Sequence, residues 1–268
     1  MTDALAAQLL DARANGDHFP EAIAGTIDLA QALDLQLAVL QPQLDAGKTV
    51  GGWKVGLTSE ASRKRLGADE RPFGFVLDER VFDSGVTIDS STITSLSIET
   101  EMCFTMGTDI SDPTITPDQV LSYMSGVSAG FELNEARTGS TRPDFFAMVT
   151  DCLTNWGIVA GEPFLLAEAN HDHTPAQMAE KLSATVITME RNGVEVFRGI
   201  SHDVVDDHTI SLCRLIEQLA AHGQGLSAGQ KIITGAFARF PTEPGDHWQA
   251  NFADIGSVEA FVQPAPST

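Results

Sequence analysis

Two glutamates separated by one residue, Glu99 and Glu101, stand in an alternating stretch that predicts a β-strand. Side chains at positions i and i+2 leave a strand on the same face. Two carboxylates on one face repel each other and lose hydration when partly buried. A hard divalent cation such as Mg²⁺, Mn²⁺ or Ca²⁺ removes this conflict, because carboxylate oxygens are its preferred ligands. For an isolated pair, the simpler interpretation is an exposed strand face with two hydrated acids.

A third acid, Glu132, lies between Phe131 and Leu133 in a segment apolar enough to form a core strand. A lone carboxylate there is costly unless it is paired, protonated or bound to a metal. An ion pair with Arg137 or Arg142 is the alternative to a metal site. Three carboxylates from two strands would leave several metal positions open to water and substrate, as Mg²⁺ prefers.

A lysine, Lys54, is the one charged residue in a short apolar strand that a glycine-containing turn follows. Such a lysine either extends to the surface or acts in a site as a hydrogen-bond donor or proton carrier. The spacing of a phosphate-binding loop is absent from this sequence. Residues 64–74 read as a helix end and a loop, and the short strand that follows ends at Asp78.

With these blocks in this order, the sequence resembles the hydratase/decarboxylase branch of the fumarylacetoacetate hydrolase superfamily. That branch includes 2-keto-4-pentenoate (2-hydroxypentadienoate) hydratase and 4-oxalocrotonate decarboxylase. The resemblance covers essentially the whole chain, and its specific blocks are the lysine-glycine segment and the Glu-x-Glu strand. The further matching segments are residues 65–74, 131–133, 151–161, 226–235 and 254–258.

The resemblance implies that Glu99, Glu101 and Glu132 bind Mg²⁺ or Mn²⁺. The metal would chelate the carboxylate and the 2-oxo or enol oxygen of a 2-hydroxy-2,4-dienoate and stabilise negative charge on that oxygen. Lys54 would be a proton donor or oxyanion partner, and Asp78 would shuttle protons or orient water.

The resemblance also implies a substrate-binding group. Leu57 belongs to it, and the hydroxyl of Thr234 and the backbone N–H of Gly235 would bind the substrate carboxylate. Arg239 follows in an otherwise apolar run and could hold the second carboxylate of a dioate substrate. An arginine that extends from a strand to the surface is the alternative interpretation.

Three segments depart from the family pattern. Residues 151–157 read Asp-Cys-Leu-Thr-Asn-Trp-Gly in place of the usual Asp-Asn-Ala-Ser-Ser-Gly. Ala236 replaces the usual Ser or Thr after the Thr-Gly motif, and residues 206–214 lack the His-Pro and Asn of many hydratases. Retained metal and lysine positions beside an altered pocket wall favour the same chemistry on a different substrate.

We therefore expect a metal-dependent lyase that hydrates a 2-hydroxy-2,4-dienoate to a 4-hydroxy-2-oxoacid in meta-cleavage aromatic catabolism. The first alternative is a decarboxylase of 4-oxalocrotonate-type 2-oxo-dioates. The second is a catalytically lapsed protein that binds an oxoacid and assembles with an active relative. The family also implies a homo-oligomer and an association with a related pathway enzyme.

The composition is that of an acidic globular protein. The 268 residues include 37 Asp and Glu against 16 Lys and Arg, which gives a formal net charge of −21. This charge argues against nucleic acid and anionic membranes as partners. The small anionic substrate that the resemblance implies would therefore have to be attracted locally, by the metal and a few basic residues. With no basic leader and no apolar run of membrane-spanning length in the sequence, we expect a cytoplasmic protein.

The predicted fold class is α+β. The family fold is a mixed, rolled β-sheet or barrel with flanking helices. Residues 1–50 would form a helical N-terminal region and residues 51–268 the catalytic part, as one domain overall. Apolar spacing predicts helices over 3–15, 26–46, 117–127, 175–183 and 209–222, and an Asn-Gly turn at 192–193 predicts a hairpin over 184–197.

Histidines and cysteines give weaker signals. Residues 202–208, rich in Asp and His, favour a helix-capping loop over a metal site, since Asp is preferred at helix N-termini. Residues 171–173, His-Asp-His, read as a solvated connector. The widely spaced Cys103, Cys152 and Cys213 are expected to be reduced and half-buried.

Overall fold

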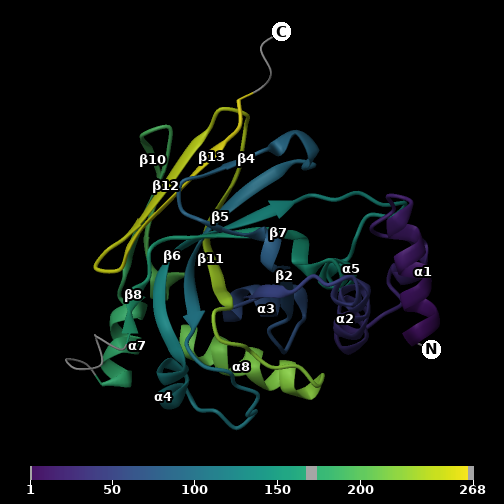
Figure 1. The fold of residues 1–268 in the computed structure, drawn as a ribbon, viewed down its shortest axis with the longest axis horizontal. Coiled ribbons are helices and arrows are strands. Elements are labelled where there is room, and N and C mark those ends of the chain that lie inside the picture. The colour runs from purple at the N-terminus through teal and green to yellow at the C-terminus, as the bar shows by residue number, and fades with distance from the viewer. Residues whose placement is uncertain (1, 167–173, 265–268) are drawn as a thin grey trace.

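The computed structural model describes residues 2–166 and 174–264 (Figure 1). Its α-helices are α1 Thr2–Ala14, α2 Leu29–Asp45, α3 Glu60–Leu66, α4 Pro117–Val120, α5 Phe145–Thr150, α7 Pro175–Ser183 and α8 His208–Ala221. Its strands are β1 Val50–Val55, β2 Phe73–Leu77, β3 Val81–Asp83, β4 Val86–Ile88, β5 Leu96–Met106, β6 Met124–Glu135, β7 Asn155–Ala160, β8 Phe164–Leu165, β9 Val186–Arg191, β10 Val194–Ile200, β11 Lys231–Pro241, β12 His247–Phe252 and β13 Gly256–Val262.

The larger sheet is mixed and curls on itself. Its strand order is β2-β1-β11-β5-β6-β7-β3, with β8 paired to β6. β1 with β11 and β3 with β7 are parallel pairs, and the other pairs are antiparallel. The curling brings together side chains of strands distant in this order, in a small separate apolar cluster of Val76, Cys103, Ile158, Ala160 and Ile233.

The second sheet has the order β10-β9-β12-β13-β4 and lies beside the curled sheet (Figure 1). Alternate residues of β12, among them Trp248, Ala250 and Phe252, are buried, as expected for a strand with one face on the core. The predicted hairpin is confirmed, since β9 and β10 are antiparallel on either side of Asn192-Gly193.

Helices cover the curled sheet at two places. α1, α2 and α5 form one group, and α8 packs against β1 and β11 beside α4 and α7 (Figure 1). α2 starts with a capping box in which Asp28 and Gln31 exchange side-chain and backbone hydrogen bonds. The fold is thus α+β with a mixed rolled sheet and an N-terminal helical part, as predicted.

Most predicted elements are present, but the helix predicted over 117–127 is wrong beyond its first turns. The helical spacing of Val120, Leu121 and Met124 is real, and a capping box at Thr116 does start α4. From Met124 onward, however, the chain pairs with β5, starting at Met106. Long-range strand pairing there overrides the local helical pattern.

Among the described residues, no helix has the length and apolar character needed to cross a membrane. The predicted solvated connector at 171–173 lies outside the described residues.

Candidate active site

The predicted metal-binding carboxylates come together inside the curled sheet. Glu99 and Glu101 lie on β5 and Glu132 lies on the adjacent β6, where Glu99 is directly opposite Glu132. One oxygen from each of the three carboxylates lies within 4.8 Å of the other two. Glu99 and Glu101 therefore lie on the same face of β5, as predicted. The antiparallel pairing of β5 with β6 brings Glu132 beside them.

Burial makes this cluster electrostatically costly. Glu99 is 9% exposed, Glu101 2%, and Glu132 is fully buried. Burial, together with the neighbouring charge of Glu132, raises the pKa of Glu99 to about 7. The same two causes raise the pKa of Glu101 well above its usual value. Three buried acids in contact thus resist full ionisation without additional positive charge.

Lys54 supplies part of that charge. It lies on β1 and is 6% exposed, and its Nζ is hydrogen-bonded to Glu132 Oε1 and lies 3.5 Å from the carbonyl oxygen of Leu153. Burial alone would lower the pKa of Lys54, but the charges of Glu132, Glu99 and Glu101 outweigh burial and raise it. The lysine is therefore held in the site as an ammonium.

Glu132 is the ionised member of the cluster. Although burial acts to raise its pKa, the charge of Lys54 and the hydrogen bonds that Glu132 accepts lower it. One of these is donated by Asn155 Nδ2 to Oε1 at 2.9 Å. An ion pair with Arg137 or Arg142, the alternative at the sequence level, is not formed: Arg137 instead contacts Glu135 at 3.0 Å and Asp151 at 2.9 Å.

The donor set fits a hard divalent cation. Glu132 Oε2 is buried and has no hydrogen-bond partner among the described residues. The backbone N–H of Gly235 donates to Glu101 Oε2 at 2.6 Å and orients that carboxylate. Full ionisation of three carboxylates beside one lysine would leave excess negative charge, which Mg²⁺ or Mn²⁺ with oxygen ligands would compensate.

The Thr234-Gly235 segment contacts the cluster on one side and a buried histidine on the other. Gly235 has a φ of 127°, and a Cβ there would lie 2.1 Å from Thr58 Oγ1, so only glycine fits. The hydroxyl of Thr234 lies 2.7 Å from His208 Nδ1, and His208 Nε2 lies 2.8 Å from Ser201 Oγ. The N–H of Gly235 is hydrogen-bonded to Glu101. The substrate-binding roles of Thr234 and Gly235 stay predictions.

His208 is the residue of this site that the sequence did not identify. Asp207 does cap α8, as predicted, with its side chain accepting from the N–H of Ile210. His208 itself is buried, and burial lowers its pKa to about 4, so the imidazole is neutral. A neutral ring donates from one nitrogen and accepts at the other, so it orients one of the two hydroxyls as donor and the other as acceptor.

Arg239 and Leu57 lie near the cluster. Arg239 Nη1 is 3.3 Å from Glu99 Oε1, Arg239 Nε donates to Ser97 Oγ at 2.9 Å, and 46% of the arginine side chain is exposed. Leu57 follows β1 with a φ of 53°, and its carbonyl accepts from Arg63 at 2.8 Å. Their roles in substrate binding stay predictions.

Asp78 is placed apart from this group. The strand predicted to end at Asp78 ends one residue earlier, at Leu77, and Asp78 begins a 3-10 turn. Asp78 is exposed, and its N–H donates to the carbonyl of Thr49. On the neighbouring strand, Lys54 is paired with Gly74, whereas Val50 is paired with Leu77. Lys54 and Val50 are separated by four residues, about 13 Å along a strand. The structure therefore brings the carboxylates and Lys54 together without Asp78.

The cysteines are reduced, as expected from the sequence, but two of them are more deeply buried than expected. All three are free, Cys103 and Cys152 are buried, and Cys213 is half-buried. Burial raises the pKa of Cys103 to about 11 and that of Cys152 to about 12. Both thiols are therefore protonated near neutral pH and are poor nucleophiles.

Comparison with known proteins gives a consistent picture. Residues 55–263 match the model of the fumarylacetoacetate (FAA) hydrolase C-terminal family. The chain is 27% identical to 4-oxalocrotonate decarboxylase of Pseudomonas sp. (strain CF600), over 86% of this chain and 84% of the relative. It is 26% identical to 2-oxo-hept-4-ene-1,7-dioate hydratase of Escherichia coli, over 87% of this chain and 86% of the relative.

A similar fold occurs in the solved structure of 4-oxalocrotonate decarboxylase from Pseudomonas putida G7, complexed with magnesium and adipate. The TM-score is 0.81 at 24% identity, over 97% of each chain. Sequence and fold comparisons therefore agree over most of the molecule.

Proposed function

This chain belongs to the fumarylacetoacetate hydrolase family, and we propose that it is a divalent-metal-dependent lyase that hydrates a 2-hydroxy-2,4-dienoate to a 4-hydroxy-2-oxoacid. The observation that carries the proposal is the buried group of Glu99, Glu101, Glu132 and Lys54. The relatives named hydratases and decarboxylases, and the magnesium and adipate in a solved structure of similar fold, support it.

The three glutamates would hold Mg²⁺ or Mn²⁺. When bound, the cation would supply Lewis-acid stabilisation of negative charge on the 2-oxo oxygen of the substrate. The chain itself preorganises these ligands, because the N–H of Gly235 fixes Glu101 and the amide of Asn155 fixes Glu132.

Lys54 is the proton carrier in this proposal. Its ammonium lies against Glu132 and holds its proton, because three glutamates raise its pKa. As the dienol becomes a 2-oxo enone, its enol oxygen loses a proton and a chain carbon gains one. Lys54 would give its proton to the carbon and take up the enol proton in return, so its charge is restored. Water then adds at the far end of the conjugated system, and the net change is the uptake of one water molecule.

A decarboxylase of 2-oxo-dioates is the second candidate, and Arg239 favours it. The guanidinium lies 3.3 Å from Glu99 and is partly exposed. It could therefore exchange this contact for the distal carboxylate of a dioate. The metal-ligand group and Lys54 would be the same, but a carboxylate would leave as CO₂ and no water would be added.

Two freshly prepared substrates distinguish the candidates. The protein with Mg²⁺ would be incubated with 2-hydroxypenta-2,4-dienoate or 4-oxalocrotonate, while dienol absorbance and CO₂ release are followed together. The proposal expects loss of absorbance without CO₂ and a 4-hydroxy-2-oxoacid product. Release of CO₂ from the dicarboxylate would move the assignment to the decarboxylase. No turnover of either substrate would contradict both.

A catalytically lapsed oxoacid-binding protein remains the third interpretation. Turnover of either substrate that disappears in Glu101→Ala would exclude it. A role in meta-cleavage catabolism, homo-oligomerisation and association with a related pathway enzyme remain predictions from the family.

A further inference from the structure

A strained turn lies between the carboxylate cluster and the N-terminal helices. Cys152, Leu153 and Thr154 have φ values of 54°, 56° and 68° in succession. Residues with side chains rarely adopt this left-handed conformation, because Cβ crowds the following carbonyl oxygen. Three in a row persist only where surrounding contacts hold them, and such strain is concentrated at functional sites.

The inner side of this turn contacts the site. The carbonyl oxygen of Leu153 faces Lys54 Nζ at 3.5 Å, and Asn155, which ends the turn, donates to Glu132 at 2.9 Å. Two glycines allow this close approach. A Cβ on Gly74 would lie 3.0 Å from the Cβ of Cys152, and one on Gly56 would lie 2.5 Å from Leu153 Cδ1.

The outer side of the turn is not closely packed. A cavity of about 500 Å³ lies there, lined by Asp151, Cys152, Asn155 and Trp156 together with residues of α2 and β2. Leu153 packs against the hydrophobic core on the inner side of the turn, but the outer side borders this cavity. On the outer side the turn is supported by polar contacts.

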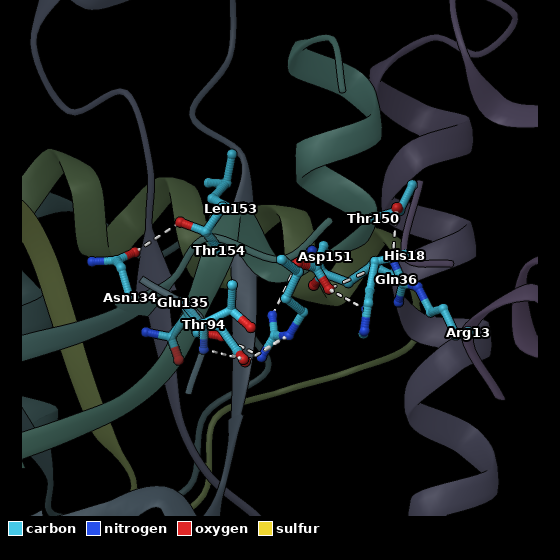
Figure 2. A network of polar contacts seen from close by, with 12 residues as sticks. Arg13, His18, Gln36, Thr94, Asn134, Glu135, Thr150, Asp151, Leu153 and Thr154 are labelled. Atoms are coloured by element: carbon cyan, nitrogen blue, oxygen red, sulfur yellow. Dashed lines mark hydrogen bonds and ion pairs between the residues drawn. The ribbon is translucent and has the colours of Figure 1, made fainter. Parts of the chain in front are cut away.

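Those contacts converge on Asp151 (Figure 2). Arg137 Nη1 lies 2.9 Å from Asp151 Oδ2, and Arg13 Nη2 lies 3.7 Å from Oδ1. Arg13 also donates to Thr150 Oγ1 at 3.0 Å, and Arg137 donates to the carbonyl of Asn155 at 3.5 Å. Asp151 is 6% exposed, so these contacts are largely shielded from water.

We propose that Asp151, held by Arg13 and Arg137, is a positioning residue that keeps the left-handed turn against the site and so fixes Asn155 on Glu132 and the Leu153 carbonyl near Lys54. This inference rests on the proposed metal-dependent function. Because Arg13 belongs to α1, the N-terminal helical region takes part in the arrangement of the active site.

The test uses Asp151→Asn, which preserves shape and removes the charge. Asp246→Asn is the matched control, because Asp246 is 5% exposed and bound by Arg191 at 2.9 Å in the second sheet. Thermal unfolding shows whether both variants are folded. Hydrogen exchange of metal-free protein reports on residues 152–156, and titration with Mn²⁺ reports on the site.

For Asp151→Asn we expect faster exchange at residues 152–156 and Mn²⁺ binding weakened roughly tenfold, as for the loss of groups that orient metal ligands. Neither measurement should change in Asp246→Asn. Arg13→Gln should also speed exchange at residues 152–156 and weaken Mn²⁺ binding, but by less than Asp151→Asn. Arg13→Lys, which keeps the positive charge, should lie between Arg13→Gln and wild type in both measurements.

Unchanged exchange in Asp151→Asn would overturn the proposal. Faster exchange with unchanged Mn²⁺ affinity would overturn it too, because Asp151 would then be only structural. Wild-type protein that binds no Mn²⁺ would instead contradict the proposed function. The exchange experiment, which needs no metal, would still decide whether Asp151 holds the turn.

Discussion

Two groups of charged side chains lie on opposite sides of the 152–154 turn, one buried inside the curled sheet and one half-buried around Asp151, and they differ in charge balance. Around Asp151, two arginines face two carboxylates, because Glu135 also contacts Arg137. Inside the curled sheet, three carboxylates face one buried lysine, and Glu132 Oε2 has no hydrogen-bond partner among the described residues. Where positive and negative side chains are equal in number, the chain itself neutralises the charge. Where carboxylates are in excess, bound protons or a cation are required. This difference supports the carboxylate cluster as the proposed site of an external cation.

Removal of a metal ligand should have the largest effect. Glu101→Ala is expected to abolish stoichiometric Mn²⁺ binding and to lower kcat/KM by roughly a thousandfold or more, since a metal contributes several kcal/mol to the transition state. Calorimetric titration and steady-state kinetics measure the two quantities. Asp246→Asn, which changes a buried carboxylate far from the cluster, should leave both near wild type.

Lys54 should be the next most sensitive position. Lys54→Met removes the proton carrier and the cation beside Glu132, so we expect kcat to fall by roughly 10²–10⁴. Mn²⁺ binding should persist, because the three carboxylates remain and lose a competing positive charge. Single-turnover kinetics beside a Mn²⁺ titration separate the two effects. A variant with near-normal kcat would refute the role of Lys54.

The unbalanced cluster should also respond to pH. The pKa of Glu99 is raised to about 7 by burial and by Glu132, so its proton stabilises the metal-free fold at low pH. Linkage means that this contribution is complete below the unfolded pKa and is lost as the pH rises through 7. Metal binding displaces such protons. Mn²⁺ should therefore raise the melting temperature more at pH 8 than at pH 6.

The control for this pH dependence is Glu99→Gln. The variant should bind Mn²⁺ more weakly, with a shallower dependence on pH between 6 and 8. An equally steep dependence in the variant would show that another group titrates.

Arg239 should give the smallest effect. Its contact with Glu99 is partly exposed, and such ion pairs contribute about 0–1 kcal/mol to stability. Arg239→Ala should leave the melting temperature nearly unchanged. It should reduce kcat/KM for a dicarboxylate substrate by roughly tenfold relative to a monocarboxylate, because one bidentate contact is lost. Equal effects on both substrates would remove Arg239 from substrate recognition.

Local patterns in the sequence were sufficient for much of the site. The alternation around Glu99 and Glu101 predicted a strand with both acids on one face, and β5 confirms it. The apolar neighbours of Glu132 predicted a core strand, which is β6. The register that places Glu99 opposite Glu132 joins segments about thirty residues apart. Residue chemistry suggested one metal site for the three carboxylates, and the family resemblance supported it, but no local pattern gave this register.

Other features depend on distant contacts and were not predictable. The short strand before Asp78 was predicted to within one residue, but the pairing of that strand with β1 puts Asp78 at the end away from Lys54. The position of His208 between Phe104 and Phe237 depends on how α8 packs on the sheet. The contact of Arg13 with Asp151 joins residues 138 positions apart, and no local pattern in either segment indicates it.

The most direct test of this account is a crystal structure of the protein grown or soaked with Mn²⁺, with anomalous diffraction used to locate the metal. The account predicts a single strong peak inside the curled sheet, with one oxygen each of Glu99, Glu101 and Glu132 about 2.0–2.2 Å away, close to the range for Mg²⁺. Manganese bound at another site, or three carboxylates that contact only Lys54 and water at saturating Mn²⁺, would contradict it.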